Sequence, residues 1–268
     1  MAAAAAGGAC LSMVTPELLN AVGTRKTLGI FSGMSVFVCT IVSFLAQPPR
    51  KFEKRSSHLV SWRDFKKPVF TLLFLSNLIQ PLTVAIPMTF GPEFSESLRF
   101  SDKMGAVLLA VNSAVGCPSR LANGYISDRI GHLNILLLAT TIYAFGTWGL
   151  WLSAAHASNG KLWITFTVLH GVVNGTFNTV INSIQRRLFG AELYFPYNGA
   201  MTSIRGVGYV VGVPLAGALV SQVKDIELSG DDFTKPIIYT GVLLLVSVLC
   251  LIGVRVVDAT ENGWMWKR

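Results

Sequence analysis

The sequence predicts an all-α integral membrane protein, and three observations lead to this fold class. Of the 268 residues, 51% are hydrophobic and only 13% are charged, whereas an average soluble domain carries about 25% charged residues. The mean hydropathy is +0.53. Long apolar runs recur from end to end, and no polar stretch is long enough to form a soluble domain. Buried core helices of a soluble protein are the competing explanation for these runs.

Seven apolar stretches approach the roughly 20 residues that a helix needs to cross a hydrocarbon core of about 30 Å. They are 28–46, 69–90, 104–126, 133–153, 162–184, 201–220 and 237–254. Each is expected to be helical, because lipid offers no hydrogen-bond partner to the backbone. Segment 1–22 is rich in small residues and contains Pro16. It is too weakly apolar to predict a span by itself, and it lacks the pattern of a signal peptide.

The distribution of basic residues predicts the orientation of these spans. Lys and Arg concentrate in alternate connections, most densely in 47–67. Because basic residues accumulate on the cytoplasmic side, we expect this loop and the C-terminus in the cytosol and the acidic segment 224–233 outside. The net charge of +8 is therefore a topology signal, and nucleic acid is not an expected partner.

Other chemistries find little support in the sequence. Cys10, Cys39, Cys117 and Cys250 lie in or near apolar segments without paired spacing, so neither a disulfide framework nor a metal site is expected. No Ser-His-Asp, Cys-His or clustered-carboxylate arrangement occurs inside the spans. We therefore expect neither an enzyme nor a cofactor.

The stretch "NGYISDRIGHLN" (123–134) places a pair of opposite charges between two apolar runs. Asp128 and Arg129 are expected in a very short cytoplasmic turn, with Gly124 allowing a neighbouring helix to approach and Gly131 allowing the reversal. The carboxylate can accept hydrogen bonds from a helix N-terminus, while the arginine reaches another carboxylate or a lipid phosphate. These four residues form a predicted conformational latch. An ordinary charged turn, solvated at the interface, is the alternative.

Two arginines are predicted to lie inside the spans. Arg120 precedes Asp128 by eight residues, which places it about 12 Å into the membrane. Because ionisable groups are costly there, Arg120 is a candidate for the substrate pathway, although a guanidinium can also snorkel to the interface. Arg205 enters at a similar depth and either shares one anion with Arg120 or faces lipid headgroups. Asn112, two turns before Arg120, is a further substrate-binding candidate.

The stretch 162–184 carries polar residues at a spacing of four. The recurring residues are His170, Asn174, Asn178 and Asn182, and the adjacent face holds Thr167, Gly171, Gly175 and Thr179. One face therefore offers hydrogen bonds and its neighbour permits close packing, as expected for the wall of a cavity. His170, Asn174 and Asn178 are therefore substrate-binding candidates. His170 is the proton-coupling candidate because histidine titrates near physiological pH. Hydrogen bonds that merely hold helices together are the alternative.

Two further groups complete the candidate residues. Asn77 and Gln80 are substrate-binding candidates, and the nearby prolines are expected to bend the helix; kinks without ligand contact are the alternative. Gly208 and Gly212 form a small-x-x-x-small pair. The residues assigned to helix packing or hinge motion are Pro81, Pro87, Gly171, Gly175, Gly208, Gly212, Pro214 and Gly217.

The segment "GYISDRIG" (124–131) resembles the G-x-L-x-D-R-x-G signature of the major facilitator superfamily, found between the eighth and ninth helices. The wider sequence resembles the monocarboxylate transporter family, especially its fungal-type members. The matching pieces are "AVGTRKTLGI", "AQPPR", "LHGVVNGTF" and "GVPLAGAL", with Arg120 before the loop and Arg255 at the end of the last span. Ile126 replaces the usual leucine, and His132–Leu133 replaces a frequent basic pair. Gly116 stands where many relatives carry an aspartate.

The resemblance implies a C-terminal portion only. Residues 1–46 would be remains of the fifth helix and the sixth helix, 47–68 a basic cytoplasmic loop between bundles, 69–256 the C-terminal six-helix bundle, and 257–268 a cytoplasmic tail. Such bundles transport by rocking one half against the other, and Arg120 is implied to pair with a substrate carboxylate.

We therefore expect part of a secondary transporter of a small organic anion such as a monocarboxylate, with protons as candidate co-substrate. The plasma membrane is the expected location, and an N-terminal half or a full-length homologue the expected partner. A non-transporting remnant that associates with a full-length transporter remains an alternative. A seven-helix receptor is less favoured, because the loop after Arg129 is very short and the last span lacks an Asn-Pro-x-x-Tyr ending.

Overall fold

A computed structural model describes residues 21–45, 60–220 and 229–263, with scattered residues between 7 and 19. The predictions for Cys10, for most of the basic loop and for the first half of segment 224–233 lie outside the described residues. The described elements are α2 (Thr24–Leu45), η1 (Asp64–Lys66), α3 (Pro68–Val84), α4 (Ile86–Ser97), α5 (Asp102–Ile130), α6 (His132–Gly146), the π-helical η2 (Thr147–Leu152), α7 (Ser153–Ala157), α8 (Gly160–Leu219), η3 (Gly230–Phe233) and α9 (Thr234–Asn262).

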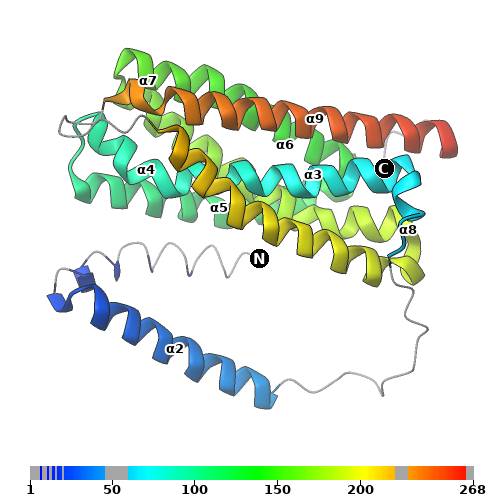
Figure 1. Cartoon of the computed structure of the whole chain (residues 1–268), viewed down its shortest axis with the longest axis horizontal. Helices are drawn as coiled ribbons and strands as arrows, with labels where there is room; N and C mark the ends of the chain where they lie inside the picture. Colours follow the sequence, from blue (N-terminus) through cyan, green and yellow to red (C-terminus); the bar gives the residue numbers. More distant parts are fainter. Residues whose placement is uncertain are drawn as a thin grey trace.

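The predicted fold class is confirmed. Within the described ranges all regular structure is helical, and six helical stretches are long and apolar enough to cross a membrane. They are Thr24–Leu45, Pro68–Ser97, Asp102–Ile130, His132–Ala157, Gly160–Leu219 and Gly230–Thr260. Figure 1 shows α3 to α9 side by side in one bundle, with α2 apart from it. Among its own residues, α2 buries only Thr27.

The 60-residue helix α8 accounts for two of the seven predicted spans. Its backbone is non-helical at Gly190, where φ is 72° and ψ is 174°, a conformation that glycine adopts without a steric penalty. The chain reverses at this residue, so the first segment of α8 (160–189) and the second segment (191–219) both lie in the bundle (Figure 1). Six helical stretches therefore contain the seven predicted crossings.

Two local features differ from, or refine, the expected helix ends. Asp128 and Arg129 lie in the last turn of α5 rather than in a turn between helices, and Gly131 alone, at φ 97°, joins α5 to α6. The helix can continue because the charged side chains point into solvent. The Pro81 and Pro87 region is interrupted at Ala85, which separates α3 from α4.

Glycines bring the second segment of α8 into backbone contact with α3. A Cβ atom at Gly212 would lie 2.5 Å from the carbonyl oxygen of Leu82 and 2.6 Å from its Cα. A Cβ atom at Gly208 would lie 2.7 Å from the carbonyl oxygen of Leu78. Real Cβ atoms cannot approach backbone so closely, so any larger residue would separate the helices. Close packing of this kind is what small residues allow in membranes.

Replacing Gly212 with Ala is expected to destabilise the bundle by roughly 1–3 kcal/mol, the usual cost of overpacking. The measurement is the thermal unfolding midpoint of the purified chain in detergent. Gly206→Ala in the same helix is the matched control, because nothing lies within 4 Å of a Cβ at Gly206. Equal midpoints for the two variants would contradict the backbone contact.

A buried carboxylate ties the start of α3 to the start of the second segment of α8. The hydroxyl of Tyr197 donates to Asp64 Oδ1 at 2.6 Å, and Lys67 Nζ donates to the same oxygen at 3.1 Å. The backbone N–H of Ser61 donates to Oδ2 at 2.9 Å. These hydrogen bonds, with Tyr197 the strongest and Lys67 adding its charge, hold the pKa of Asp64 well below its usual range.

The depressed pKa gives Asp64 a defined effect on stability. The ionised carboxylate stabilises the fold above its unfolded-state pKa of about 3.9, and this contribution is lost as the pH falls. Asp64→Asn is expected to cost about 2 kcal/mol at neutral pH, the scale of a hydrogen bond to a charged group. The variant should also lose less stability than wild type as the pH falls from about 5 to about 2, because the unfolded-state carboxyl takes up a proton in this range while the folded one resists it. Unfolding midpoints measured across that range would show parallel curves if Asp64 made no such contribution.

Candidate functional site

The candidate site is built where α5 meets the first segment of α8. A Cβ atom at Gly171 would lie 2.6 Å from the carbonyl oxygen of Asn112, and one at Gly116 would lie 3.3 Å from the carbonyl oxygen of Gly171. One turn further along α8, a Cβ atom at Gly175 would overlap the Cγ and Nε atoms of Arg120. The missing side chain at Gly175 therefore provides the space that Arg120 fills. Arg120 lies half-buried between the two helices.

Asn112 joins the two helices through its side-chain amide. Its Nδ2 donates to the carbonyl oxygen of Thr167 at 2.9 Å and lies 2.8 Å from Nδ1 of His170. A carbonyl oxygen only accepts, so the NH₂ group must face it, and Nδ1 of His170 is then the acceptor of the second bond. In this arrangement the imidazole is neutral, with its proton on Nε2. His170 is only 1% exposed.

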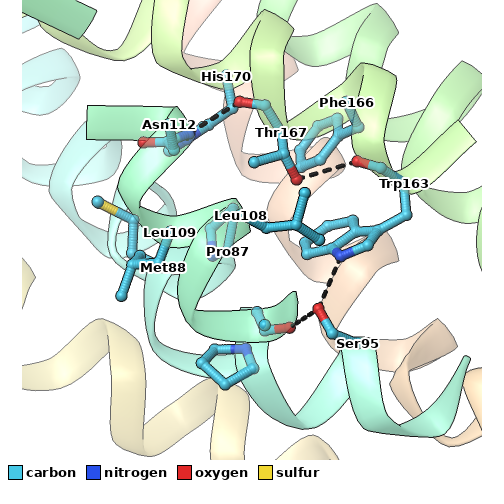
Figure 2. Close-up of a pocket in the computed structure, with 13 residues that line it drawn as sticks. Pro87, Met88, Ser95, Leu108, Leu109, Asn112, Trp163, Phe166, Thr167 and His170 are labelled. Atoms are coloured by element: carbon cyan, nitrogen blue, oxygen red, sulfur yellow. Dashed lines mark hydrogen bonds between the residues drawn. The ribbon is translucent and has the colours of Figure 1, made fainter. Parts of the chain in front are cut away.

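A small pocket lies beside this amide (Figure 2). Its cavity of about 20 Å³ has room for about one water molecule. Apolar groups of Pro87, Leu108 and Trp163 form much of the lining, and Trp163 Nε1 donates to Ser95 Oγ at 2.9 Å. The pocket is therefore too small for an organic substrate in this conformation.

The asparagines of α8 differ in exposure and in partners. Asn174 is half-buried, with Nδ2 3.8 Å from Met88 Sδ in α4. Asn178 accepts a hydrogen bond from Nη2 of Arg205, which extends from the second segment of α8. Asn182 is exposed. The predicted stripe thus runs from a buried end at His170 to an open end at Asn182.

Two candidates in α3 present buried acceptors. Asn77 is fully buried and donates from Nδ2 to the carbonyl oxygen of Leu73 at 2.7 Å. Gln80 is 4% exposed and lines a cavity of about 10 Å³ together with Asn174 and Phe177. Within the described part of the chain, Oδ1 of Asn77 and Oε1 of Gln80 have no hydrogen-bond donor. Buried acceptors of this kind usually mark a place for water or a ligand.

The charged latch residues contact neighbours on their own helix or at the start of the next, whereas Gly124 faces α8. Oδ1 of Asp128 lies 3.5 Å from Nε2 of His132, the first residue of α6. The guanidinium carbon of Arg129 lies 4.6 Å from the ring centroid of Tyr125. A Cβ atom at Gly124 would lie 3.9 Å from Thr179, an ordinary contact that is looser than the one at Gly171.

Two contacts were not expected from the sequence. Asn123 donates from Nδ2 to Thr176 Oγ1 at 2.6 Å and to the carbonyl oxygen of Val172 at 3.1 Å. Asn123 lies three residues after Arg120 and eleven after Asn112, on the same helix face. This spacing could have predicted that Asn123 also contacts α8. The Asp64–Tyr197 hydrogen bond joins residues 133 positions apart, and no local pattern indicates it.

The electrostatics of the site follow from the sequence around it. Segments 104–127, 160–191 and 193–224 contain no Asp or Glu, yet they hold Arg120 and Arg205. Gly175 and Asn178, which the two arginines contact, are three residues apart and so share one helix face. No group of three or more potential metal ligands occurs among the residues that the structure describes. The site therefore offers positive charge and neutral amides.

Comparison with known proteins identifies the family. A model of the Major Facilitator Superfamily matches residues 1–193. An MFS-type transporter of Gibberella moniliformis is 22% identical over 98% of this chain and 61% of its own length. The MFS-type transporter opdF of Penicillium oxalicum is 26% identical over 98% and 60%. The riboflavin transporter MCH5 of Saccharomyces cerevisiae is 22% identical over 91% and 47%.

The chain therefore belongs to the major facilitator superfamily of transporters, as the "GYISDRIG" resemblance predicted, and it is a multi-pass integral membrane protein. It spans about half to three fifths of the length of these three relatives.

Asn112→Leu is expected to destabilise the chain because it leaves the Thr167 carbonyl and the His170 imidazole buried without a donor. An unsatisfied buried group typically costs about 1–3 kcal/mol. The loss should appear as a lower thermal unfolding midpoint. Asn182→Leu is the matched control, since Asn182 is exposed. A wild-type midpoint for Asn112→Leu would show that the amide bridge contributes nothing.

Proposed function

We propose that this chain forms the substrate-binding C-terminal part of a secondary transporter for a small organic anion of the monocarboxylate type. One observation carries the proposal: Arg120 lies half-buried against Gly175 in span segments that contain no carboxylate. A guanidinium can bind a carboxylate through two parallel hydrogen bonds. In a low-dielectric site such a contact is strong.

The surroundings of Arg120 support binding rather than anchoring to lipid. Between residues 238 and 256 of α9 the exposed side chains are apolar, among them Val242, Leu249 and Val256, as expected of a surface that faces acyl chains. Arg120 and Asn123, in contrast, contact α8 inside the bundle. Gln80 and Asn174 add amide groups around the same part of α8.

The name of one relative, the riboflavin transporter MCH5, refers to a small organic compound, and another is named as the fujikurins efflux protein of Gibberella fujikuroi. These names agree with a small organic substrate but do not indicate its charge. The proposed negative charge of the substrate is inferred from Arg120. Alternating access requires a second bundle. We therefore propose that an N-terminal half completes the route, and that the assembly lies in the plasma membrane.

Proton coupling is the finer part of the proposal, with His170 as its carrier. The bond from Asn112 to Nδ1 fixes a neutral imidazole in this conformation. A proton on Nδ1 would remove that acceptor and break one of the two hydrogen bonds by which Asn112 joins α5 to α8. Coupling through His170 therefore requires that protonation accompany a change in the packing of these two helices.

The alternative role is association of this chain with a full-length transporter, without transport by this chain itself. The chain spans 47–61% of the length of the relatives cited above. Co-purification with a full-length homologue, combined with no uptake when an N-terminal half is supplied, is the result that would favour this role.

Arg120→Ala is expected to abolish uptake of a labelled monocarboxylate such as lactate when the chain is co-expressed with a matching N-terminal half. The reason is loss of the cation that binds the substrate carboxylate. Arg186→Ala, an exposed arginine near the end of the first segment of α8, is the control and should retain uptake. Uptake by Arg120→Ala with unchanged apparent affinity would refute the role.

A further inference from the structure

A second cation, Arg205, is held in the bundle by neutral groups. Its Nη2 donates to Oδ1 of Asn178, and its guanidinium carbon lies 5.3 Å from the ring centroid of Phe177. The side chain is half-buried. Its Nε is buried and has no hydrogen-bond partner within the part of the chain that the structure describes. Arg205 therefore has donor capacity that its present contacts leave unused.

The unused donor is on the edge of the guanidinium that suits a carboxylate. Nε–H and one N–H of Nη2 point in the same direction, and a carboxylate binds this edge with two parallel hydrogen bonds. The Asn178 carbonyl oxygen is bonded to Nη2, and Nε–H of the same edge is left without an acceptor in the described structure. An incoming carboxylate would replace one neutral acceptor with two charged ones. The exchange favours the anion, because hydrogen bonds to charged groups are the stronger ones.

The position of Arg205 relates it to Arg120. Asn178 and Gly175, which the two arginines contact, lie one turn apart on the same face of α8. Arg120 approaches this face from α5 and Arg205 from the second segment of α8. Since the surrounding segments contain no Asp or Glu, this chain supplies two positive charges to one face and no negative charge.

We infer that Arg205 is a second anion-binding residue: an anion with one carboxylate binds at Arg120 alone, and an anion with two carboxylates binds more tightly because its second carboxylate contacts Arg205. The inference rests on the proposed function, because it assumes that Arg120 binds the first carboxylate. Asn178 holds Arg205 in place while the site is empty. A second carboxylate can bind only if it replaces the Asn178 carbonyl oxygen on Arg205.

The test compares two four-carbon acids, succinate with two carboxylates and butyrate with one. Each is titrated against the purified 268-residue chain at constant sodium concentration, and binding is followed by the rise in thermal unfolding midpoint. Succinate is expected to bind wild type roughly ten- to a hundredfold more tightly than butyrate, the gain expected of one additional charged contact. Arg205→Gln should reduce succinate binding to the level of butyrate.

Asn178→Asp is the sharper variant. It keeps the size of the side chain and places a carboxylate on Arg205, so the succinate preference should disappear while butyrate binding stays. Asn182→Asp adds the same charge one turn away at an exposed position and should keep the preference. Equal binding of the two acids by wild type, or a preference that survives in Arg205→Gln, overturns the inference.

The failure of the proposed function looks different. If Arg120→Gln binds both acids as wild type does, the first carboxylate site is wrong. If neither acid raises the midpoint of wild type, both proposals are refuted. A preference for succinate that depends on Arg205 but not on Arg120 overturns the pairing of the two arginines.

Discussion

The arrangement of this bundle depends on direct backbone contact between helices at glycine residues. Gly171 brings the first segment of α8 against Asn112 of α5, and Gly212 brings the second segment against Leu82 of α3. Both segments belong to one chain that reverses at Gly190. In lipid, where apolar surfaces gain little from association, close packing of small residues and hydrogen bonds must hold helices together. In this packing, Arg120 and Arg205 both contact one face of the first segment of α8, at Gly175 and Asn178.

The buried polar groups divide into two kinds that sequence spacing does not separate. The Asn112 amide bonds to Thr167 and to Nδ1 of His170 and bridges two helices, whereas Arg205 Nε, Asn77 Oδ1, Gln80 Oε1 and the second ring nitrogen of His170 are buried without a partner in the described structure. A bridge stabilises one packing of the helices. An unused buried group is costly unless water or a ligand reaches it, so this second group is the better guide to where a substrate binds.

Hydropathy was sufficient to predict the membrane class and the positions of the crossings, because lipid imposes a fixed length and composition on each helix. The motif "GYISDRIG" was sufficient for the family. The prediction that Asp128 and Arg129 lie in a turn was wrong. Composition locates a charged boundary but does not show which residue ends the helix. Here α5 continues through both residues and is ended by Gly131. The four-residue period of α8 predicted a polar face. Its partners on α5, α4 and the second segment of α8 lie far away in sequence, so a local pattern cannot name them.

The most direct measurement tests whether the polar face of α8 meets water or lipid. In a chain whose native cysteines are replaced, Asn178→Cys and Leu249→Cys are exposed to a charged, water-soluble thiol reagent in membranes that also carry the N-terminal half. An aqueous route along α8 predicts rapid modification of Asn178→Cys, slowed by a bound anion, and little modification of Leu249→Cys. Modification at Leu249→Cys with none at Asn178→Cys would place the asparagines in lipid and contradict the transport route.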